Sequence, residues 1–317
     1  MTNNTPALSI VINTKDAAAT LQHTLDSIAP FDAEVIVMDM ASSDETVEIA
    51  RTAGVTVYTH PDVGYVEPAR NAAIAKANGR WILILDADET LSKSCRENIS
   101  ELIASSKSKE TVGEAEIVAY SVPRKNYIFK SWVKHTGWWP DYQLRLFQKG
   151  SVTWSDQIHS VPKVAGVTQE LEAKQELAII HQQYPTVTDF IQKLDRYTAI
   201  EADSPAQNDG KSDKDFSPDA FIETYFSEIF SRLFAEKGIK DGNHGVSLSF
   251  LQANYQLITQ LKLWQRAGFK QIKNEDAVLN QLEKSLSDLR YWIADYQVSR
   301  TQGLKQVYWK LRRAVRV

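Results

Sequence analysis

Two aspartates separated by one residue, Asp86 and Asp88, follow a short apolar run at residues 81–85. A run this apolar favours a strand buried on both faces, as in a parallel sheet. Ligands of open α/β sheets bind beyond the carboxyl ends of such strands, where two carboxylates can share a divalent cation with a phosphate group. An isolated pair of this spacing is more often a solvated loop or a helix cap, so the preceding elements decide its meaning.

The preceding residues alternate between short apolar strands and amphipathic helices. The spacing of apolar residues favours strands at residues 8–12, 34–38 and 55–58 and helices at residues 17–28, 44–53 and 67–77. Short connections between such elements predict a parallel sheet flanked by helices and joined by right-handed crossovers. The strand that carries the two aspartates is the fourth in this series.

Polar side chains also end the first two strands. Asn13 and Thr14 follow the first strand, and Asp39 ends the second. Because parallel strands end at the same edge, these side chains should meet Asp86 and Asp88 there. An acidic residue at the end of the second strand can accept hydrogen bonds from a ribose or a base, so a nucleotide is a reasonable ligand. Neither a Gly-rich dinucleotide motif nor a phosphate-binding P-loop follows the first strand.

An aromatic-rich stretch in the middle of the chain mixes ring, acidic and basic side chains. Trp138 and Trp139 stand close to Asp141, Gln143 and Arg145. This mixture suits carbohydrate, because flat apolar faces stack on sugar C–H groups while polar groups bind the hydroxyls. The alternative is a structural hairpin whose aromatic side chains belong to the core.

The last third of the chain is expected to be helical. Amphipathic segments are predicted at residues 189–203, 218–236, 247–267 and 275–300, with a polar loop at residues 204–217. The basic tail at residues 302–317 carries Trp and Tyr, so it can lie on an anionic membrane surface; a helix packed on the catalytic domain with a solvated basic face is the alternative. We therefore expect an N-terminal domain at residues 1–185, with a nucleotide-binding half at 1–92 and an acceptor half at 115–185, followed by a helical region at 186–317.

Composition narrows the class of protein. Hydrophobic residues make up 43% of the chain and charged residues 24%, with a net charge of −4, so nucleic acid is not an expected partner. A single cysteine, Cys95, fits a reducing compartment. The first residues lack a signal-peptide pattern, and no apolar run approaches the ~20 residues that span a bilayer. We expect a cytoplasmic protein, peripheral to a membrane at most.

Taken together, these motifs resemble those of family-2 glycosyltransferases with the GT-A fold. The resemblance rests on residues 9–14, 35–46, 64–71 and 82–89, in order and at family spacing. Residues 137–147 look like the subgroup that includes lipopolysaccharide-core glucosyltransferases. The family usually has a small pair such as Ser-Gly where this chain has Met40 and Ala41. The implied fold is α/β, a Rossmann-like, mixed and mainly parallel sheet flanked by helices and followed by the helical region.

The resemblance implies a UDP-sugar donor and a place for each part of it. Asn13 and Asp39 would hold the uracil and the ribose, with Thr14 and Ser42 beside them. Arg70 would face the diphosphate or the sugar.

The resemblance also implies a divalent cation. Asp86 would contact the ribose or the sugar, and Asp88 would bind Mn²⁺ or Mg²⁺ that bridges the two phosphates. His159 is a candidate additional ligand, although a lone histidine such as His159 or His181 is more often a core or surface group.

The acceptor side follows from the chemistry of transfer. Family-2 enzymes invert the anomeric centre, so a single in-line displacement is expected, and the acceptor hydroxyl then needs a general base. Asp141 is the candidate base and Asp156 is its rival. Trp138 and Trp139 would line the site of a saccharide or lipid-linked saccharide, while Gln143 and Arg145 would position the base or the diphosphate.

Two other functions remain open on the sequence. Residues 82–91 also fit the first motif of haloacid dehalogenase-type phosphatases, in which the first aspartate is a nucleophile. That class needs a later apolar strand ending in paired acids, and none follows Leu91. A non-catalytic protein that binds nucleotide sugars is the other alternative, and it is disfavoured because the acidic positions all remain.

Overall fold

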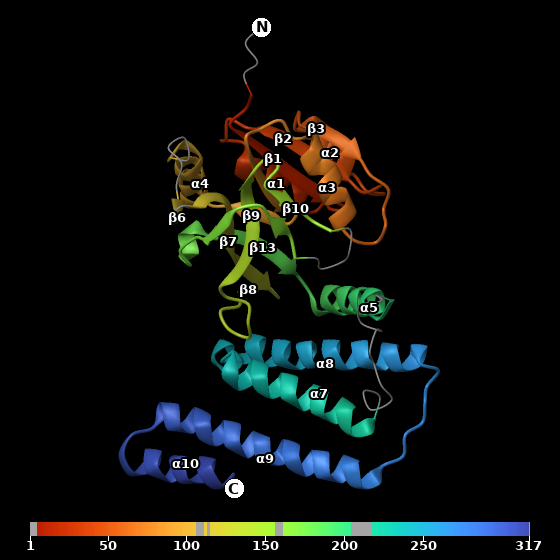
Figure 1. Ribbon diagram of the computed structural model, residues 1–317, viewed down its shortest axis with the longest axis vertical. Helices are drawn as coiled ribbons and strands as arrows, with labels where there is room; N and C mark the ends of the chain where they lie inside the picture. The colour runs from red at the N-terminus through yellow and green to blue at the C-terminus, as the bar shows by residue number, and fades with distance from the viewer. Residues whose placement is uncertain (1–4, 106–110, 113–114, 156–160, 204–216, 317) are drawn as a thin grey trace. The chain divides into compact units, whose positions relative to one another are not determined.

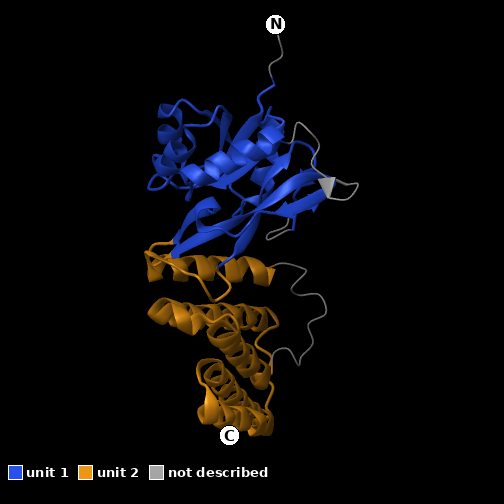
Figure 2. Ribbon diagram, turned by 90° about the vertical axis from the view of Figure 1, so that its left-hand side faces the viewer, with its two compact units in different colours: residues 1–127, 139–183 blue, residues 128–138, 184–317 orange. Residues whose placement is uncertain are grey.

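The structure is a computed structural model, and it describes residues 5–105, 111–112, 115–155, 161–203 and 217–316 of the 317-residue chain. The chain divides into two compact units (Figure 2). Unit 1 comprises Met1–Tyr127 and Trp139–Gln183, and unit 2 comprises Ile128–Trp138 and Tyr184–Val317.

One half of the sheet in unit 1 is parallel. Its strands lie in the order β3-β2-β1-β4, with bounds β1 (Leu8–Thr14), β2 (Glu34–Asp39), β3 (Thr56–Thr59) and β4 (Trp81–Asp86). Every residue of β1 is buried, as are the first five residues of β4. The apolar runs therefore form central strands covered on both faces, as the sequence predicted.

Helices cover the two faces of this parallel half (Figure 1). They are α1 (Leu21–Ile28), α2 (Thr46–Thr52), α3 (Glu67–Lys76) and α4 (Lys93–Ser105). Ile10 and Ile12 pack with the apolar residues of α1 and α4, whereas Val11 packs with those of α3. This alternation follows from the strand period of two, which turns successive side chains to opposite faces.

The other half of the sheet is largely antiparallel. The sheet continues from β4 through β9 (Asp141–Gln148), β7 (Ala115–Ile128) and β13 (Ile179–Tyr184) to β5 (Glu89–Leu91). The pairs β4–β9, β7–β9 and β13–β5 are antiparallel. The expected mixed sheet with flanking helices is thereby confirmed, and its antiparallel half lies beside the aspartate-bearing strand.

Several short elements complete the chain before the helical region. They are β6 (Thr111–Val112), β8 (Ser131–Trp132), β10 (Val152–Thr153), β11 (Lys163–Val164), β12 (Val167–Glu170) and a 3₁₀ turn η1 (Gln175–Leu177). The strands β10 and β11 pair with each other, and β12 pairs with β7 in parallel.

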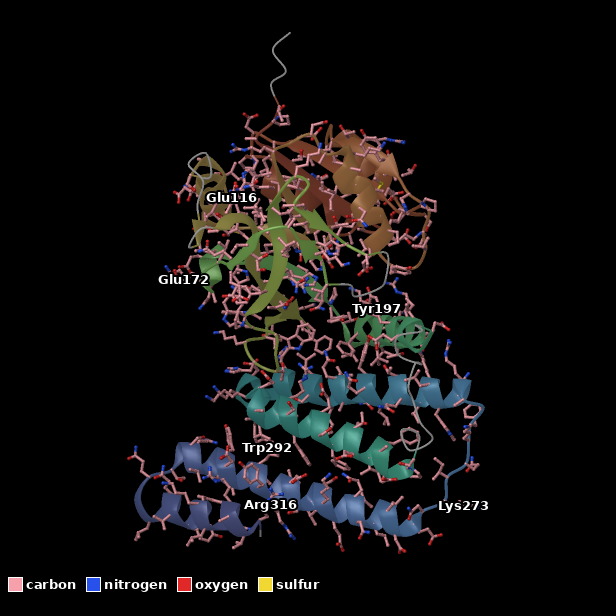
Figure 3. The ribbon with its side chains drawn as sticks, in the orientation of Figure 1. Glu116, Glu172, Tyr197, Lys273, Trp292 and Arg316 are labelled. Atoms are coloured by element: carbon pink, nitrogen blue, oxygen red, sulfur yellow. The ribbon has the colours of Figure 1, made fainter. Side chains whose placement is uncertain are left out.

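Unit 2 is built mainly of helices. They are α5 (Val187–Asp203), α7 (Pro218–Phe230), the π-helical turn η3 (Ser231–Ala235), the 3₁₀ turn η4 (Gly238–Asp241), α8 (Gly242–Arg266), α9 (Glu275–Arg300) and α10 (Gly303–Val315). The long helix α8 packs against α5 and α7, while α9 packs against α7 and α10. Trp292, labelled on α9 in Figure 3, stacks on Phe234 with ring centroids 6.1 Å apart. Among the described helices, none is both long and apolar enough to cross a membrane.

Candidate functional site

The ends of three strands meet at one edge of the sheet in unit 1. The β1–β2 register places Thr14 beside Asp39, and the β1–β4 register places Asn13 beside Asp86. The sequence predicted this meeting because parallel strands end at the same edge. Four polar side chains are therefore neighbours at the position where open α/β sheets bind ligands.

Several buried polar atoms at this edge lack hydrogen-bond partners. Asn13, Thr14 and Asp39 are 5%, 2% and 2% exposed. Both amide atoms of Asn13, the hydroxyl of Thr14 and Oδ1 of Asp39 accept or donate no hydrogen bond within the described residues. Leaving a buried polar group unpaired costs about 1–3 kcal/mol, and native proteins rarely do so. The group is therefore arranged to bind a polar ligand.

The loop after β2 holds one side of this group. The backbone N–H of Ser42 donates to Asp39 Oδ2 at 3.1 Å, and the Ser42 hydroxyl accepts from the backbone N–H of Asp16 at 2.8 Å. Lys15 Nζ donates to the carbonyl oxygen of Ala41 at 2.5 Å. Ala41 has φ 55°, in the left-handed region that favours glycine. The loop thus keeps a glycine-type backbone at the position where the sequence has alanine.

A cluster of ion pairs lies behind the aspartate motif. Arg145 Nη2 is 2.6 Å from Asp86 Oδ2 and 2.6 Å from Glu89 Oε1. Arg124 Nη1 lies 3.1 Å from the same oxygen of Glu89. Arg70 Nη2 lies 3.7 Å from Asp86 Oδ1. Asp86 and Glu89 are thus held by arginines.

The arginines of this cluster differ in how far the neighbouring acids offset the effect of burial on their charges. Burial would raise the pKa of the Asp86 carboxyl, but Arg145, Arg70 and Arg124 hold it well below its ordinary range. Burial would lower the pKa of Arg145, but Asp86 and Glu89 raise it above its ordinary value. For Arg70, burial lowers the pKa and the attraction of Asp86 only partly offsets it.

Arg70 also has a hydrogen-bond donor that is not used within the described residues. Its Nε is buried and has no hydrogen-bond partner in the described part of the chain. Its guanidinium lies 5.4 Å from the centroid of the Trp154 ring. Of the three arginines, Arg70 is the one whose charge is least satisfied by protein acids, so it has the most capacity to bind an anion.

Asp141 is held as an ionised carboxylate on β9. Its Oδ2 accepts from Arg124 Nε and from Asn126 Nδ2, both at 2.8 Å, and its Oδ1 accepts from Gln143 Nε2 at 2.7 Å. Burial would raise the pKa of Asp141, but Arg124 and the bonds from Asn126 and Gln143 hold it below its ordinary value. At neutral pH this side chain can accept a proton or a hydrogen bond but cannot donate one.

Asp88 faces a histidine rather than an arginine. Its carboxylate Oδ2 lies 3.5 Å from Nε2 of His181, and its side chain is 27% exposed. The other ring nitrogen of His181, Nδ1, is 2.7 Å from Oδ1 of Asn126. Among the residues that the structure describes, no group of three or more His, Cys, Asp or Glu side chains is arranged to hold a metal ion.

The remaining predicted residues are spread over the two units. Trp138 is partly buried against the apolar cluster of unit 2 that contains Phe190 and Leu248. Trp139 is partly buried in unit 1. His159, the candidate metal ligand, and Asp156, the rival base, lie outside the described residues, so both assignments stay predictions.

Three side chains of the site were missed by the sequence reasoning: Glu89, Arg124 and Asn126. Only β9 carries a sequence signal, an alternation of polar and apolar residues that puts positions 141, 143 and 145 on one face; positions 124 and 126 share a face of the paired strand β7. Arg124 and Asp141 are a cross-strand pair in the β7–β9 register. Long-range pairing of this kind is what places the missed residues at the site.

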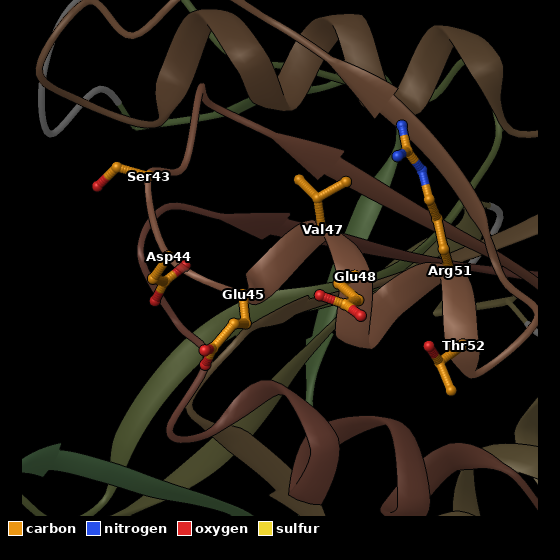
Figure 4. A pocket seen from close by; sticks show the side chains of 7 residues that line it. All are labelled: Ser43, Asp44, Glu45, Val47, Glu48, Arg51 and Thr52. Carbon is orange, nitrogen blue, oxygen red and sulfur yellow. The ribbon is translucent and has the colours of Figure 1, made fainter.

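A separate hollow lies beside α2 (Figure 4). It is lined by Ser43, Asp44, Glu45, Val47, Glu48, Arg51 and Thr52. None of the strand-end residues contributes to this lining. The hollow is therefore distinct from the edge where the unpartnered polar atoms gather.

Comparison with known proteins gives a consistent family. Residues 9–161 match the model of the family described as "Glycosyl transferase family 2". An uncharacterized glycosyltransferase of Rickettsia bellii is 40% identical over 101 residues, which cover 32% of this chain and 34% of that protein. The chain thus spans about a third of the length of such curated relatives. The lipopolysaccharide core biosynthesis glycosyltransferase LpsC of Rhizobium meliloti is 25% identical over 265 residues, covering 78% of this chain and 88% of LpsC.

The similar solved structures are more distant in sequence. The structure of S. aureus TarS residues 1–349 in complex with UDP is 12% identical, with a TM-score of 0.41 over 85% of this chain and 94% of that one. The mannosyltransferase PcManGT of Pyrobaculum calidifontis, in complex with GDP-Man and Mn²⁺, is 14% identical, with a TM-score of 0.41 over 98% and 88% of the two chains.

Proposed function

Because this chain belongs to glycosyl transferase family 2 through residues 9–161, we propose that it moves a sugar from a UDP-sugar to a hydroxyl of a saccharide or lipid-linked saccharide. The observation that carries the proposal is the set of unpartnered buried polar atoms on Asn13, Thr14 and Asp39. A nucleoside offers both donors and acceptors to these atoms, through its base edge and its ribose hydroxyls. We assign the transfer to residues 1–185, with the donor on residues 1–92 and the acceptor on residues 115–185.

The donor side uses the strand ends in order across the sheet. Asn13 binds the uracil edge and Asp39 accepts from a ribose hydroxyl through its unpartnered Oδ1, with Thr14 and Ser42 beside them. Arg70 binds the diphosphate or the sugar, since its Nε is unpartnered and its charge is the least satisfied of the three arginines. Asp86, which Arg145 and Arg70 hold, contacts the ribose or the sugar.

A divalent cation, Mn²⁺ or Mg²⁺, fits the residues near the diphosphate. Asp88 is partly exposed, unlike the fully buried Glu89 beside it, and its carboxylate oxygen is a hard ligand of the type that these cations prefer. We therefore assign Asp88 as a ligand and keep His159 as a candidate. When bound, such a cation stabilises the negative charge that develops on the leaving diphosphate.

Asp141 is the proposed general base. The acceptor hydroxyl loses its proton to Asp141 as its oxygen bonds to the anomeric carbon, and the bond from that carbon to the diphosphate oxygen breaks, releasing UDP with inversion. Since Oδ2 already accepts from Arg124 and Asn126, Oδ1 is the oxygen that takes the proton. Gln143 and Arg145 act as positioning residues, because Gln143 bonds Asp141 and Arg145 bonds Asp86.

This arrangement favours transfer over the phosphatase alternative. A phosphatase nucleophile at Asp86 would need an oxygen available for attack, whereas Asp86 Oδ2 accepts a 2.6 Å bond from Arg145 and Oδ1 faces Arg70. The acceptor is proposed to belong to the cell envelope, in line with the name of LpsC, a relative that aligns with most of this chain. Trp138 and Trp139 are proposed to line the acceptor saccharide.

The last helix offers a surface for the membrane that holds a lipid-linked acceptor. On α10, five apolar side chains share one face and are more than half exposed: Leu304, Val307, Tyr308, Leu311 and Val315. Arg313 and Arg316 are paired with Asp295 and Asp288 of α9, so the apolar face points away from α9. Lys305 and Lys310 are exposed beside this apolar face. We propose that α10 rests on an anionic lipid surface.

The proposed function is tested by UDP release against a panel of UDP-sugars with Mn²⁺ or Mg²⁺. We expect release with one donor, together with a rise in the melting temperature of the protein when that donor is bound. Asp39→Ala should remove the rise, whereas Glu48→Gln, in the hollow beside α2, should keep it. No release and no thermal shift with any nucleotide sugar would contradict the proposal, and phosphatase activity lost in Asp86→Asn would support the rival class.

A further inference from the structure

We propose that His135 is the centre of a saccharide-binding site within unit 2, where its Nε2 accepts a hydrogen bond from a sugar hydroxyl and Asp241 sets the tautomer of the ring. The inference rests on the proposed function for the class of ligand, since a saccharide is the acceptor proposed there. Both residues belong to unit 2, and Asp241, the last residue of η4, lies outside the residues that match the family model.

Asp241 fixes which nitrogen of His135 carries the proton. Oδ1 of Asp241 is 2.6 Å from Nδ1 of His135. The other oxygen, Oδ2, accepts from the backbone N–H of Lys134 at 2.9 Å and from that of His135 at 2.7 Å. Because a carboxylate can only accept, Nδ1 carries the proton and donates it. The neutral imidazole therefore has its lone pair on Nε2.

The second ring nitrogen of His135 is open to a ligand. The His135 side chain is 28% exposed, whereas that of Asp241 is 10% exposed. Nε2 forms no hydrogen bond or ion pair with any residue that the structure describes. The carboxylate thus orients the ring from the protein side, and Nε2 is the atom left to bind.

The backbone beside His135 is held in a strained conformation. Thr136 is fully buried and has φ 60°, in the left-handed region, which costs a residue with a side chain roughly 1–2 kcal/mol. Its N–H donates to the carbonyl oxygen of Glu236 at 2.8 Å, and its own carbonyl oxygen accepts from Arg232 Nη1 at 2.6 Å. Arg232 is held in turn by Glu228, with Nε 2.7 Å from Oε1. Strain of this kind persists where the surroundings enforce it, and it gathers at binding sites.

The chemistry of this turn favours a neutral sugar over an anion. A lone pair on Nε2 selects a hydrogen-bond donor, and hydroxyl groups are the donors that a saccharide presents. An anionic oxygen has no proton to donate and would be repelled by Asp241 behind the ring. The backbone N–H of Trp138 donates to the carbonyl oxygen of His135 at 3.1 Å, so an indole belongs to the same turn. Aromatic side chains with a few oriented polar groups are the usual composition of a ligand site.

The test follows the ring nitrogens of His135 by nuclear magnetic resonance, on the full chain labelled with ¹⁵N-histidine. Spectra are recorded at a pH above which they no longer change, so that the ring is neutral and the two chemical shifts report which nitrogen carries the proton. We expect the proton on Nδ1. The probes are the methyl glycosides of glucose, galactose and N-acetylglucosamine, and the Nε2 signal should move saturably with at least one of them.

Two variants separate binding from support of the turn. His135→Asn keeps a donor near the position of Nδ1 but removes Nε2, so it should melt as the wild type does and bind the glycoside about tenfold more weakly, read from saturation-transfer signals of the glycoside. In Asp241→Asn the amide oxygen is needed by the two backbone N–H groups, so the amide nitrogen faces Nδ1 and the proton should move to Nε2. His23→Asn, a change at an exposed histidine of α1, is the matched control and should bind the glycoside as the wild type does.

The outcomes separate this inference from the proposed function. A wild-type ring with the proton on Nε2, or with signals that move with none of the glycosides, overturns the inference. A shift with inorganic phosphate alone also overturns it, and so does undiminished glycoside binding by His135→Asn, which would leave His135 only a support of the turn. In each case UDP release with a sugar donor leaves the proposed transferase standing. Glycoside binding at His135 without UDP release from any donor would instead retain this site and remove the proposed function.

Discussion

The buried Arg145 forms an ion pair with the partly exposed Asp86, with Nη2 2.6 Å from Oδ2, and the same nitrogen lies 2.6 Å from the fully buried Glu89. One guanidinium thus neutralises two carboxylates at the end of β4. Removing it would leave both acids with Arg70 and Arg124 as their remaining cations, at distances of 3.1–4.0 Å. The pair is therefore a structural requirement of the aspartate motif as well as a part of the site.

Arg145→Met is expected to destabilise the protein by about 3 kcal/mol, because it breaks the buried ion pair with Glu89 and leaves Arg124 to balance Glu89 as well as Asp141. Urea unfolding of the variant and the wild type at neutral pH measures the difference. Lys284→Met is the matched control, since Lys284 pairs with Glu223 on the exposed surface of unit 2 and should contribute less than about 1 kcal/mol. Equal effects of the two changes would contradict the assignment.

The same pair predicts a dependence on pH. The pKa of Asp86 is lower in the folded protein than in the unfolded chain, because the arginines outweigh the effect of burial. The pair therefore contributes stability that is present above the ordinary carboxyl pKa of about 3.9 and is lost as the pH falls through the lower folded value. The difference in unfolding free energy between wild type and Arg145→Met should shrink below pH ~4.

Arg124→Gln should move the acidic limb of the pH profile of kcat/KM to higher pH. Burial raises the pKa of Asp141 and Arg124 is the main group that lowers it, so loss of Arg124 raises the pKa of Asp141. Activity of a general base is lost when it is protonated, so the limb follows this pKa. Lys125→Gln is the matched control, because successive side chains of β7 point to opposite faces. If the limb does not move, Asp141 is not the base and Asp156 becomes the candidate to test.

The parallel half of the sheet could be predicted from the sequence because each strand there is marked by its own short run of apolar residues. Strands buried on both faces read as continuous apolar runs, and the polar residues that follow them, such as Asn13 and Asp86, must then share an edge. The structure confirms that these residues meet at one edge, while their binding of a donor remains a proposal.

The antiparallel half could not be read in the same way. Arg124 and Asn126 reach the site because β7 pairs with β9 in one particular register. The residues around them form no local pattern that predicts this register. The placement of Trp138 in unit 2 has a similar cause, since its apolar neighbours come from helices far along the chain. Local sequence patterns therefore could not predict these contacts, which join residues far apart in the chain.

Ala41→Gly should stabilise the protein by up to ~1 kcal/mol. Ala41 has φ 55°, where an L-residue with a side chain costs roughly 1–2 kcal/mol more than glycine, and the greater freedom of glycine in the unfolded chain offsets part of this gain. Ala53→Gly is a control of opposite sign, because Ala53 ends α2 with φ −71°, where alanine is unstrained. The urea midpoints of both variants decide the matter, and a loss of stability in Ala41→Gly would mean that the loop is not strained.

The surface of α10 gives a prediction for membrane binding. Lys305→Glu with Lys310→Glu should weaken sedimentation with phosphatidylglycerol vesicles by more than tenfold at low salt, since each cation near an anionic surface contributes ~1 kcal/mol. Leu304→Ser with Leu311→Ser should weaken it too, because both leucines are exposed on the apolar face, at 89% and 64%. Lys163→Glu with Lys273→Glu makes the same change of charge at exposed lysines elsewhere and should bind vesicles as the wild type does. Equal loss in both lysine pairs would indicate attraction by net charge alone, and binding to phosphatidylcholine vesicles as strong as to the anionic ones would contradict the proposed role of the cations.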